Sequence, residues 1–159
     1  MGKDTGFIEF EKQAVPRREI QERVQDFREY DLNYSDNDMR QQASRCMDCG
    51  IPFCHMGCPL GNMIPDWNDL VYRDQWQDAL GALHSTNNFP EFTGRICPAP
   101  CEDSCVLNEH YTLDPEEKIK KKHAVTIEQV EKHIAERGWE EGWIQPQPPN
   151  KETGKKIAV

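Results

Sequence analysis

Seven cysteines in two tight groups constrain this chain more than any other feature of its sequence. The spacing is C-x2-C-x4-C-x3-C-P in the first group and C-P-x2-C-x3-C in the second. The first group contains Cys46, Cys49, Cys54 and Cys58, and the second contains Cys97, Cys101 and Cys105. Thiols at such short intervals are typical of a metal–sulfur centre. Two cubane iron–sulfur clusters need eight ligands, so a residue of another type has to supply the eighth.

A zinc-binding module is an alternative interpretation of the same cysteines. Structural zinc sites usually combine two C-x2-C knuckles or a set of four Cys and His residues. This chain has one such knuckle, from Cys46 to Cys49, and no matching second one. Iron–sulfur ligation therefore fits the spacing better than two zinc sites do.

The bulk composition excludes several classes of partner and location. A formal net charge of -9 argues against a nucleic-acid partner, because phosphate backbones normally attract clustered Lys and Arg. No stretch approaches the ~20 apolar residues of a membrane span, and the N-terminus carries no secretory signal. Closely spaced thiols are then expected in a reducing compartment, the cytoplasm. Hydrophobic residues make up only 36% of the 159 residues, so cofactors or partner surfaces are expected to supply part of the stability.

The order of the cysteines suggests how they divide between two clusters. In the bacterial two-cluster ferredoxin run, the cysteine that precedes a proline ligates the other cluster. Cys58 precedes Pro59, so it is expected to leave the first cluster and join the second. Cluster one would then be held by Cys46, Cys49, Cys54 and Cys105. Cluster two would be held by Cys58, Cys97 and Cys101, with one ligand missing.

The missing ligand is expected to be Glu131. Its helical position places it on the same apolar face as Ile127, Val130 and Ile134, where an unpaired carboxylate would be costly to bury. Binding to iron would remove that cost. The alternative is that Glu131 only borders the face and reaches solvent or an arginine. The other residues considered for the vacancy are His55, His84, His110, His123, His133, Asp48, Glu102 and Asp103.

Helical periodicity dominates the rest of the chain and strand patterns are nearly absent, so the expected fold is all-α. An amphipathic helix is predicted after Pro16, with apolar positions at Ile20, Val24, Phe27 and Tyr30. Capping boxes, apolar faces and cysteine spacing predict further helices, which begin at Ser35, Ile64, Trp76, Pro98 and Thr126. Residues 87–95 are predicted to be loop, and residues 108–123 an exposed excursion.

The expected domain organisation has three parts. Residues 1–14 are predicted to be an extended arm, and residues 15–145 the cluster-binding domain. Residues 146–159 are predicted to be a linker followed by the truncated start of another domain. The linker is proline-rich, and Lys155–Val159 resembles the first residues of a buried strand. The sequence is therefore interpreted as a fragment of a longer protein.

Four long motifs identify a family. They are Cys-Gly-Ile-Pro-Phe-Cys-His-Met-Gly-Cys-Pro-Leu-Gly-Asn at 49–62, Ile-Pro-Asp-Trp-Asn-Asp-Leu-Val-Tyr at 64–72, Thr-Asn-Asn-Phe-Pro-Glu-Phe-Thr-Gly-Arg-Ile-Cys-Pro-Ala-Pro-Cys-Glu at 86–102, and Val-Thr-Ile-Glu-Gln-Val-Glu at 125–131. Together they resemble the N-terminal region of the glutamate synthase small (beta) subunit. The resemblance extends over nearly the whole chain.

This resemblance implies an alpha-helical ferredoxin domain that wraps around two 4Fe-4S clusters and is shared with dihydropyrimidine dehydrogenase. By similarity, the seven cysteines match the cluster ligands in the division given above. In the dehydrogenase relative, a glutamine in the helix equivalent to residues 126–137 supplies the fourth ligand of one cluster. Glu131 falls at or next to that position, so the resemblance implies that it completes cluster two.

The resemblance also implies a function and partners. Small subunits of this type pass hydride from NADPH to FAD, and their clusters relay electrons to the FMN-containing large (alpha) subunit, which forms glutamate. The FAD and NADPH sites would lie beyond the end of this sequence. The leading hypothesis is therefore an electron-relay module that is not catalytic by itself. Arg45 and Arg95 are expected to shield the clusters, although Arg95 fits a plain salt bridge equally well.

The competing hypothesis is an assembly domain that docks the flavoprotein onto the large subunit. Its anchors would be the four tryptophans Trp67, Trp76, Trp139 and Trp143. Aromatic residues at helical spacing are, however, more often part of a core.

Overall fold

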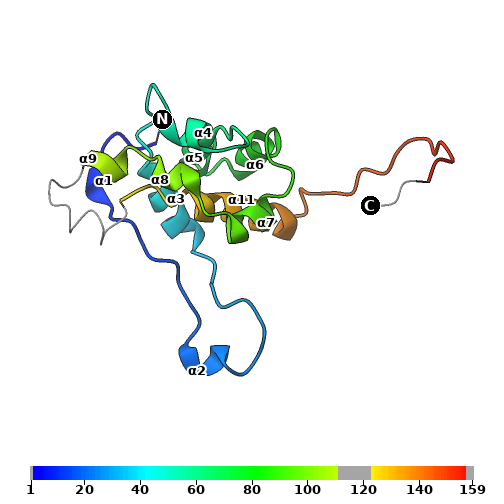
Figure 1. The fold of residues 1–159 in the computed structure, drawn as a ribbon, viewed down its shortest axis with the longest axis horizontal. Coiled ribbons are helices and arrows are strands. Elements are labelled where there is room, and N and C mark those ends of the chain that lie inside the picture. The colour runs from blue at the N-terminus through cyan, green and yellow to red at the C-terminus, as the bar shows by residue number, and fades with distance from the viewer. Residues whose placement is uncertain (1, 111–122, 157–159) are drawn as a thin grey trace.

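All the regular elements that the structure describes are helices, apart from one isolated bridge between Arg17 and Asp31. The computed structural model describes residues 2–110 and 123–156, and within them the all-α prediction is confirmed (Figure 1). The helices are α1 (Gly6–Glu9), α2 (Ile20–Arg23), α3 (Asp36–Ser44), α4 (Phe53–Gly57), α5 (Ile64–Tyr72), α6 (Trp76–His84), α7 (Pro90–Ile96), α8 (Pro100–Asp103), α9 (Leu107–His110) and α11 (Ile127–Glu140).

The core forms around α11, which packs against α3, α6 and α7, while α5 packs against both α3 and α6 (Figure 1). Trp67 of α5, Leu83 of α6 and Ile134 of α11 are fully buried where these helices meet. Burial of each such side chain contributes about 1.5–3 kcal/mol. The predicted helices from Ile64 and Trp76 are confirmed.

Helix α11 carries the buried stripe that its periodicity predicts. Ile127, Val130 and Ile134 are buried, and Glu131 lies among them with 7% of its surface exposed. The helix begins after Thr126 as expected, but the predicted capping box is wrong. The Thr126 hydroxyl instead donates to Oε1 of Gln42 at 3.3 Å and so ties the start of α11 to α3.

Helix α3 begins at the capping residue that the sequence predicts. The Oγ atom of Ser35 accepts a hydrogen bond from the backbone N–H of Asp38 at 3.1 Å and satisfies one of the free donors of the first turn. The helix ends at Ser44, and Arg45 and Cys46 follow directly. Because α3 begins at Asp36 and ends at Ser44, Cys46 lies beside the core.

Replacing Ser35 by alanine is expected to lower the free energy of unfolding by about 1 kcal/mol, because the N–H of Asp38 loses its acceptor. Thermal unfolding followed by circular dichroism measures the change. Ser35→Asp keeps a capping oxygen and is the matched control. An alanine variant as stable as the aspartate variant would show that the cap contributes nothing.

Two helix predictions in the second half of the chain are wrong. Residues 90–96 form α7 rather than loop, because a proline at the first helical position needs no N–H partner. The single helix expected over Pro98–Leu107 is split into α8 and α9. Ala99 precedes Pro100 and adopts a left-handed conformation, with φ of 51°, so α8 can start only at Pro100. Cys105 therefore lies between two helices.

The amphipathic helix predicted after Pro16 is also wrong. Residues 15–34 form a projecting segment that leaves the body of the molecule and contains only the short helix α2 (Figure 1). Its four predicted core residues, Ile20, Val24, Phe27 and Tyr30, are all exposed. The periodicity is present, but these side chains stay exposed, and a short helix whose apolar face is not packed is only marginally stable.

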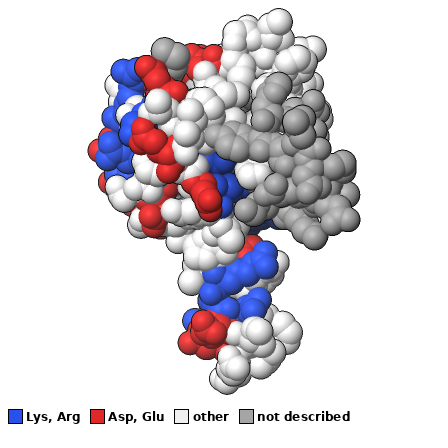
Figure 2. Space-filling model, turned by 90° about the vertical axis from the view of Figure 1, so that its left-hand side faces the viewer, with Lys and Arg blue, Asp and Glu red and all other residues white. Residues whose placement is uncertain are grey.

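Ion pairs shape the projecting segment. Both guanidinium NH groups of Arg18 donate to the carboxylate of Asp26, at 2.9 and 2.8 Å, and Arg17 pairs with Asp31 at 2.9 Å. Figure 2 shows blue and red side chains next to each other along this projection, with uncharged surface at its tip. The segment thus combines local charge pairing with exposed apolar residues.

The N-terminal arm is not extended throughout, because Gly6–Glu9 form α1. The N–H of Lys3 donates to the carbonyl of Ser44 at 3.2 Å, so the arm is bound to the end of α3. A Cβ atom on Gly6 would lie 2.2 Å from the carbonyl oxygen of Ser44, so this approach requires glycine.

The predicted excursion at 108–123 lies largely outside the described residues, as do the last residues of the predicted strand at Lys155–Val159. Residues 145–149 have no regular secondary structure and are exposed, as a linker would be. None of the helices within 2–110 and 123–156 is long and apolar enough to cross a membrane.

Candidate metal centre

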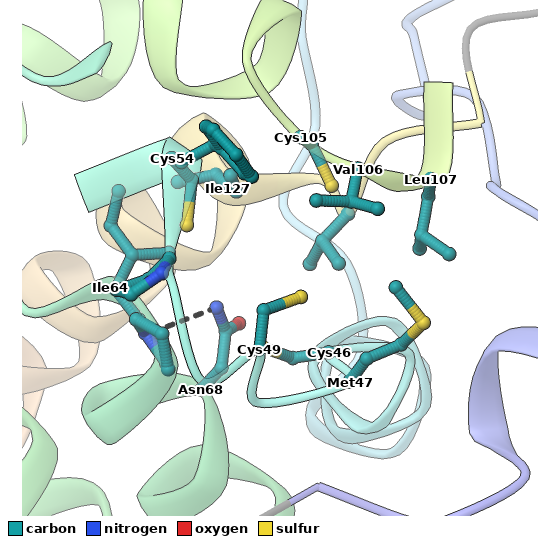
Figure 3. A pocket seen from close by; sticks show the side chains of 14 residues that line it. Cys46, Met47, Cys49, Cys54, Ile64, Asn68, Cys105, Val106, Leu107 and Ile127 are labelled. Atoms are coloured by element: carbon teal, nitrogen blue, oxygen red, sulfur yellow. Dashed lines mark hydrogen bonds between the residues drawn. The ribbon is translucent and has the colours of Figure 1, made fainter. Parts of the chain in front are cut away.

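Four cysteines from two distant parts of the chain line one pocket. Cys46, Cys49 and Cys54 come from the segment after α3, and Cys105 comes from the turn between α8 and α9. Figure 3 shows Cys54 and Cys105 on one side of the pocket and Cys46 and Cys49 on the other. These are the four residues expected to hold cluster one.

The rest of this pocket is apolar, with walls formed by Ile64, Val106, Leu107, Val125 and Ile127. Burial raises the pKa of Cys46 to about 12, and it raises the pKa of Cys54 to about 11. The neighbouring thiols add to both shifts, because like charges close together oppose ionisation. Four thiolates in such a pocket need a cationic partner, and a cluster of iron ions supplies one.

Backbone geometry orients these thiols. Asp48, between Cys46 and Cys49, has φ of 50° in the left-handed region, which turns the C-x2-C loop back on itself. Backbone hydrogen bonding at Asp48 and at His55 opposes the rise in the pKa of Cys46 and of Cys54. Strain of about 1–3 kcal/mol at a non-glycine residue of this kind is typical of functional sites.

Two residues of the second set, Cys58 and Cys101, lie where α4 packs against α8, and α8 also contacts α11. Helices α4 and α8 pack together, and Cys58 directly follows α4 while Cys101 lies within α8. Burial raises the pKa of Cys101, and the charges of Glu102, Cys58 and Glu131 raise it further. Cys101, Cys58 and Glu131 therefore share one electrostatic environment. Cys97 is half-buried at the end of α7, and the described contacts do not join its sulfur to these three.

A glycine sets the close approach of α4 to α8. A Cβ atom on Gly57 would lie 2.3 Å from Oγ of Ser104 and 3.1 Å from the carbonyl oxygen of Pro100. Because Gly57 precedes Cys58, this contact holds the Cys58 backbone against the helix that carries Cys101.

Glu131 is buried, and neutral donors surround its carboxylate. Asn87 Nδ2 donates to Oε1 at 3.0 Å, the Thr93 hydroxyl also donates to Oε1, and Asn62 Nδ2 donates to Oε2 at 3.4 Å. Burial raises the pKa of Glu131, and the bonds from Thr93 and Asn87 oppose that shift. No lysine or arginine within 2–110 and 123–156 forms an ion pair with it, so the alternative of an arginine partner is not supported.

Several competing candidates for the eighth ligand have other partners. His133 Nε2 lies 3.0 Å from Oδ1 of Asp36. Glu102 accepts a hydrogen bond from Lys12 at 2.6 Å and another from the backbone N–H of Glu128 at 3.1 Å. The side chain of His110 lies outside the described residues.

The two arginines expected to shield the clusters have structural roles. Arg45 is buried and donates to the carbonyls of Phe10, Ala124 and His123, at 3.0, 3.0 and 2.6 Å. It therefore joins the N-terminal arm to the segment before α11. Arg95 pairs with Glu29 of the projecting segment at 2.9 Å, so the salt-bridge interpretation of Arg95 is confirmed.

The tryptophans divide between core and surface. Trp67 and Trp76 are buried in the core, so neither can anchor a partner in this conformation. Trp139 is 52% exposed at the end of α11, and Trp143 is partly buried. The docking hypothesis therefore loses two of its four proposed anchors.

Four thiols around one apolar pocket match the sulfur ligands of a 4Fe-4S cluster. Across residues 2–110 and 123–156, no three His, Cys, Asp or Glu side chains are close enough together to hold one metal ion. A zinc ion would require its sulfur ligands within about 2.3 Å of itself. Thiols spread around an apolar pocket fit the corners of a larger inorganic core.

Comparison with known families agrees with this donor set. The family model described as dihydropyrimidine dehydrogenase domain II, 4Fe-4S cluster, matches residues 23–143, which is most of the chain. The chain belongs to this 4Fe-4S domain family. The matched range includes all seven cysteines and Glu131.

Relatives of this 4Fe-4S domain occur in glutamate synthases. The chain is 52% identical over 155 residues to the glutamate synthase [NADPH] small chain of Mycobacterium tuberculosis, and 48% identical over 168 residues to that of Bacillus subtilis. It is 44% identical over 156 residues to the glutamate synthase [NADH] of Schizosaccharomyces pombe. These matches cover 97–100% of the chain. They confirm the predicted resemblance, although the chain spans only 30% of the Mycobacterium protein, 32% of the Bacillus protein and 7% of the Schizosaccharomyces protein.

Sequence reasoning missed the three residues that surround Glu131 in this 4Fe-4S domain. Asn87 and Thr93 belong to the 86–102 motif, and Asn62 ends the 49–62 motif, yet none was assigned a role. Their positions inside long polar-and-cysteine motifs were the available signal. Their common target, 38 to 69 residues away, emerges only in the folded chain.

Proposed function

We propose that this domain binds two 4Fe-4S clusters and relays electrons within a glutamate synthase. The observation that carries the proposal is the convergence of Cys46, Cys49, Cys54 and Cys105 on one apolar pocket. Three of these come from one motif and the fourth from a segment 51 residues further along the chain than Cys54. Such a pairing of distant thiols is what a shared cluster requires.

The pocket supports the proposed ligands of cluster one, and those of cluster two are proposed from the family resemblance. Cluster one is held by Cys46, Cys49, Cys54 and Cys105, and cluster two by Cys58, Cys97, Cys101 and Glu131. When bound, such clusters supply one-electron transfer without proton chemistry of their own. The contact of α4 with α8 and α11 with α8 supports the second set.

The residues around the ligands have three tasks. The apolar walls, including Ile64 and Ile127, exclude water from cluster one. Backbone groups at Asp48 and His55 act to lower the pKa of Cys46 and Cys54 and so favour their thiolates. Arg45 holds the segment before α11 in place through three backbone carbonyls.

The wider function follows from the relatives. We infer that electrons come from an NADPH-reduced FAD in the rest of the small subunit and pass to the FMN-containing large subunit, where glutamate forms. Residues 15–145 would be the relay domain, and 146–159 the link to the flavin domain. Free thiols at such short spacings are expected in a reducing compartment, so the proposed location is the cytoplasm.

Docking is a second candidate function, and the projecting segment favours it. Ile20, Val24 and Phe27 are exposed there although their spacing is that of a packed helix face. A partner surface that covers them would bury this apolar area. This role is compatible with the relay and does not need metal.

One experiment separates the relay from docking alone. In the complete two-subunit enzyme, Cys101→Ala removes a thiol near α4 and leaves the projecting segment unchanged. If the domain relays electrons, NADPH-dependent glutamate formation is lost while the subunits still co-elute on size exclusion. Assembly with undiminished glutamate formation would instead establish docking as the only function.

Replacement of Glu131 by alanine is expected to change cluster two alone. The carboxylate is the only assigned ligand of that cluster that is not a thiol, so its EPR signal should change or disappear while that of cluster one persists. EPR of the dithionite-reduced chain measures this. Glu136→Ala on the same helix is the control, because Glu136 pairs with Arg95 on the surface. Two unchanged signals in the Glu131 variant would remove it from the ligand set.

A further inference from the structure

The environment of Glu131 distinguishes its two oxygens. Oε1 accepts two hydrogen bonds, from Nδ2 of Asn87 at 3.0 Å and from the hydroxyl of Thr93. Among residues 2–110 and 123–156, Oε2 accepts one, from Nδ2 of Asn62 at the longer distance of 3.4 Å. A carboxylate has about four acceptor positions in all, two on each oxygen. Oε1 is therefore saturated, and Oε2 keeps a free acceptor position.

A second partner fixes the orientation of each amide. The Oδ1 atom of Asn87 accepts the backbone N–H of Phe89 at 3.1 Å, so its NH2 group must point toward Glu131. The Oδ1 atom of Asn62 accepts the Thr86 hydroxyl at 2.6 Å, which directs its NH2 group to Glu131 as well. Flipping either amide would place an oxygen against the carboxylate and lose both bonds.

The Thr93 hydroxyl belongs to the same network. It accepts a hydrogen bond from Asn87 Nδ2 at 2.8 Å, and Oε1 of Glu131 is the nearest acceptor for its single hydrogen, ahead of the carbonyls of Phe89 at 3.3 Å and Pro90 at 3.5 Å. Asn62, Asn87 and Thr93 come from three segments: the turn after Cys58, the loop after α6, and α7. Asn62 and Asn87 are buried, so these bonds form away from water and hold the carboxylate tightly.

We propose that Asn62, Asn87 and Thr93 are positioning residues: Asn87 and Thr93 saturate Oε1 of Glu131, Asn62 orients Oε2, and Oε2 keeps the acceptor position that would bind iron. This inference rests on the proposed function and deepens it. The three donors are neutral, so none of them supplies a positive charge to balance the carboxylate, and a metal partner would supply one. Hydrogen bonds to a ligand also draw electron density from it, which favours the reduced state of the cluster.

Thr93→Val tests the inference, because valine keeps the shape of threonine and removes the hydroxyl. In the reconstituted chain, an EPR-monitored redox titration should show a lower midpoint potential and an altered signal for cluster two, with cluster one unchanged. Thr93→Ser restores the donor and should restore both readings. Thr126→Val is the control, because Thr126 is a buried threonine just before α11 whose hydroxyl donates to Gln42.

The outcomes separate this inference from the proposed function. Two clusters with unchanged potentials in Thr93→Val, alongside an altered cluster two in Glu131→Ala, would overturn the positioning role alone. A wild-type chain that takes up no cluster would overturn the proposed function. If Thr93→Val does not fold, Thr93→Ala removes the same donor without the second methyl group, and unchanged potentials there count equally against the inference.

Discussion

The chain with Cys105 replaced by alanine is expected to lose cluster one and keep cluster two. Iron content should fall from about eight to about four per chain, because a cubane cluster carries four irons and needs its fourth thiolate. The reason is spatial: Cys105 lines the pocket with Cys46, Cys49 and Cys54, although its sequence neighbours are the ligands of the other cluster. Anaerobic iron and sulfide analysis measures the loss, and EPR identifies the cluster that remains.

The matched variant is Cys101→Ala, four residues earlier in the same motif. Cys101 shares its surroundings with Cys58 and Glu131 instead, so this variant should lose cluster two and keep cluster one. If both variants lose the same cluster, the division of ligands by spatial position is wrong. If neither loses iron, neither thiol is a ligand.

Replacement of Gly94 by alanine is expected to destabilise the domain by about 1–3 kcal/mol. A Cβ atom at this position would lie 2.7 Å from Cβ and 2.9 Å from Cα of Lys132 on α11. The backbone of α11 cannot yield as a flexible side chain could, so α7 has to move away. Because α7 carries Thr93 and leads into Cys97, cluster two should also become labile. Thermal unfolding and the rate of iron release to a chelator measure both effects.

Gly81→Ala is the control for this variant. Gly81 also lies within a helix, but a Cβ atom there would meet no atom within 4 Å. Alanine should therefore raise stability by about 0.5–1 kcal/mol through helix propensity. Gly94→Ala should lower the free energy of unfolding and Gly81→Ala should raise it. The opposite signs distinguish a steric clash from an effect of helix propensity. A Gly94→Ala variant as stable as Gly81→Ala would show that α7 does not press on α11.

Local chemistry explains which parts of the fold the sequence predicts. The Ser35 cap and the Ile127 to Ile134 stripe depend on residues a few positions apart, and both were predicted correctly. The periodicity at Ile20 to Tyr30 looks the same, yet these residues are exposed. Whether such an apolar face is buried depends on a second surface that packs against it, and the local sequence carries no information about that surface. Proline is common both in loops and at the first position of a helix, and Pro90 is the first residue of α7.

At the candidate site, too, the sequence predicts local features but not the contacts between distant residues. Thiol spacing indicated a metal–sulfur centre, and helical position indicated that Glu131 is buried. The hydrogen bonds of Asn87 and Thr93 to Glu131 join residues 44 and 38 positions apart, and only the packing of α7 on α11 brings them together. Short-range pattern thus predicts ligand type, while tertiary packing sets the environment of each ligand.

The most direct test of the central claim is the iron and acid-labile sulfide content of the oxygen-free chain, with Mössbauer spectroscopy to identify the cluster type. Two clusters held by seven thiols and one carboxylate predict about eight irons and about eight sulfides per chain, all in 4Fe-4S form. A chain that is colourless and free of iron after anaerobic reconstitution, yet well folded by circular dichroism, would contradict the account.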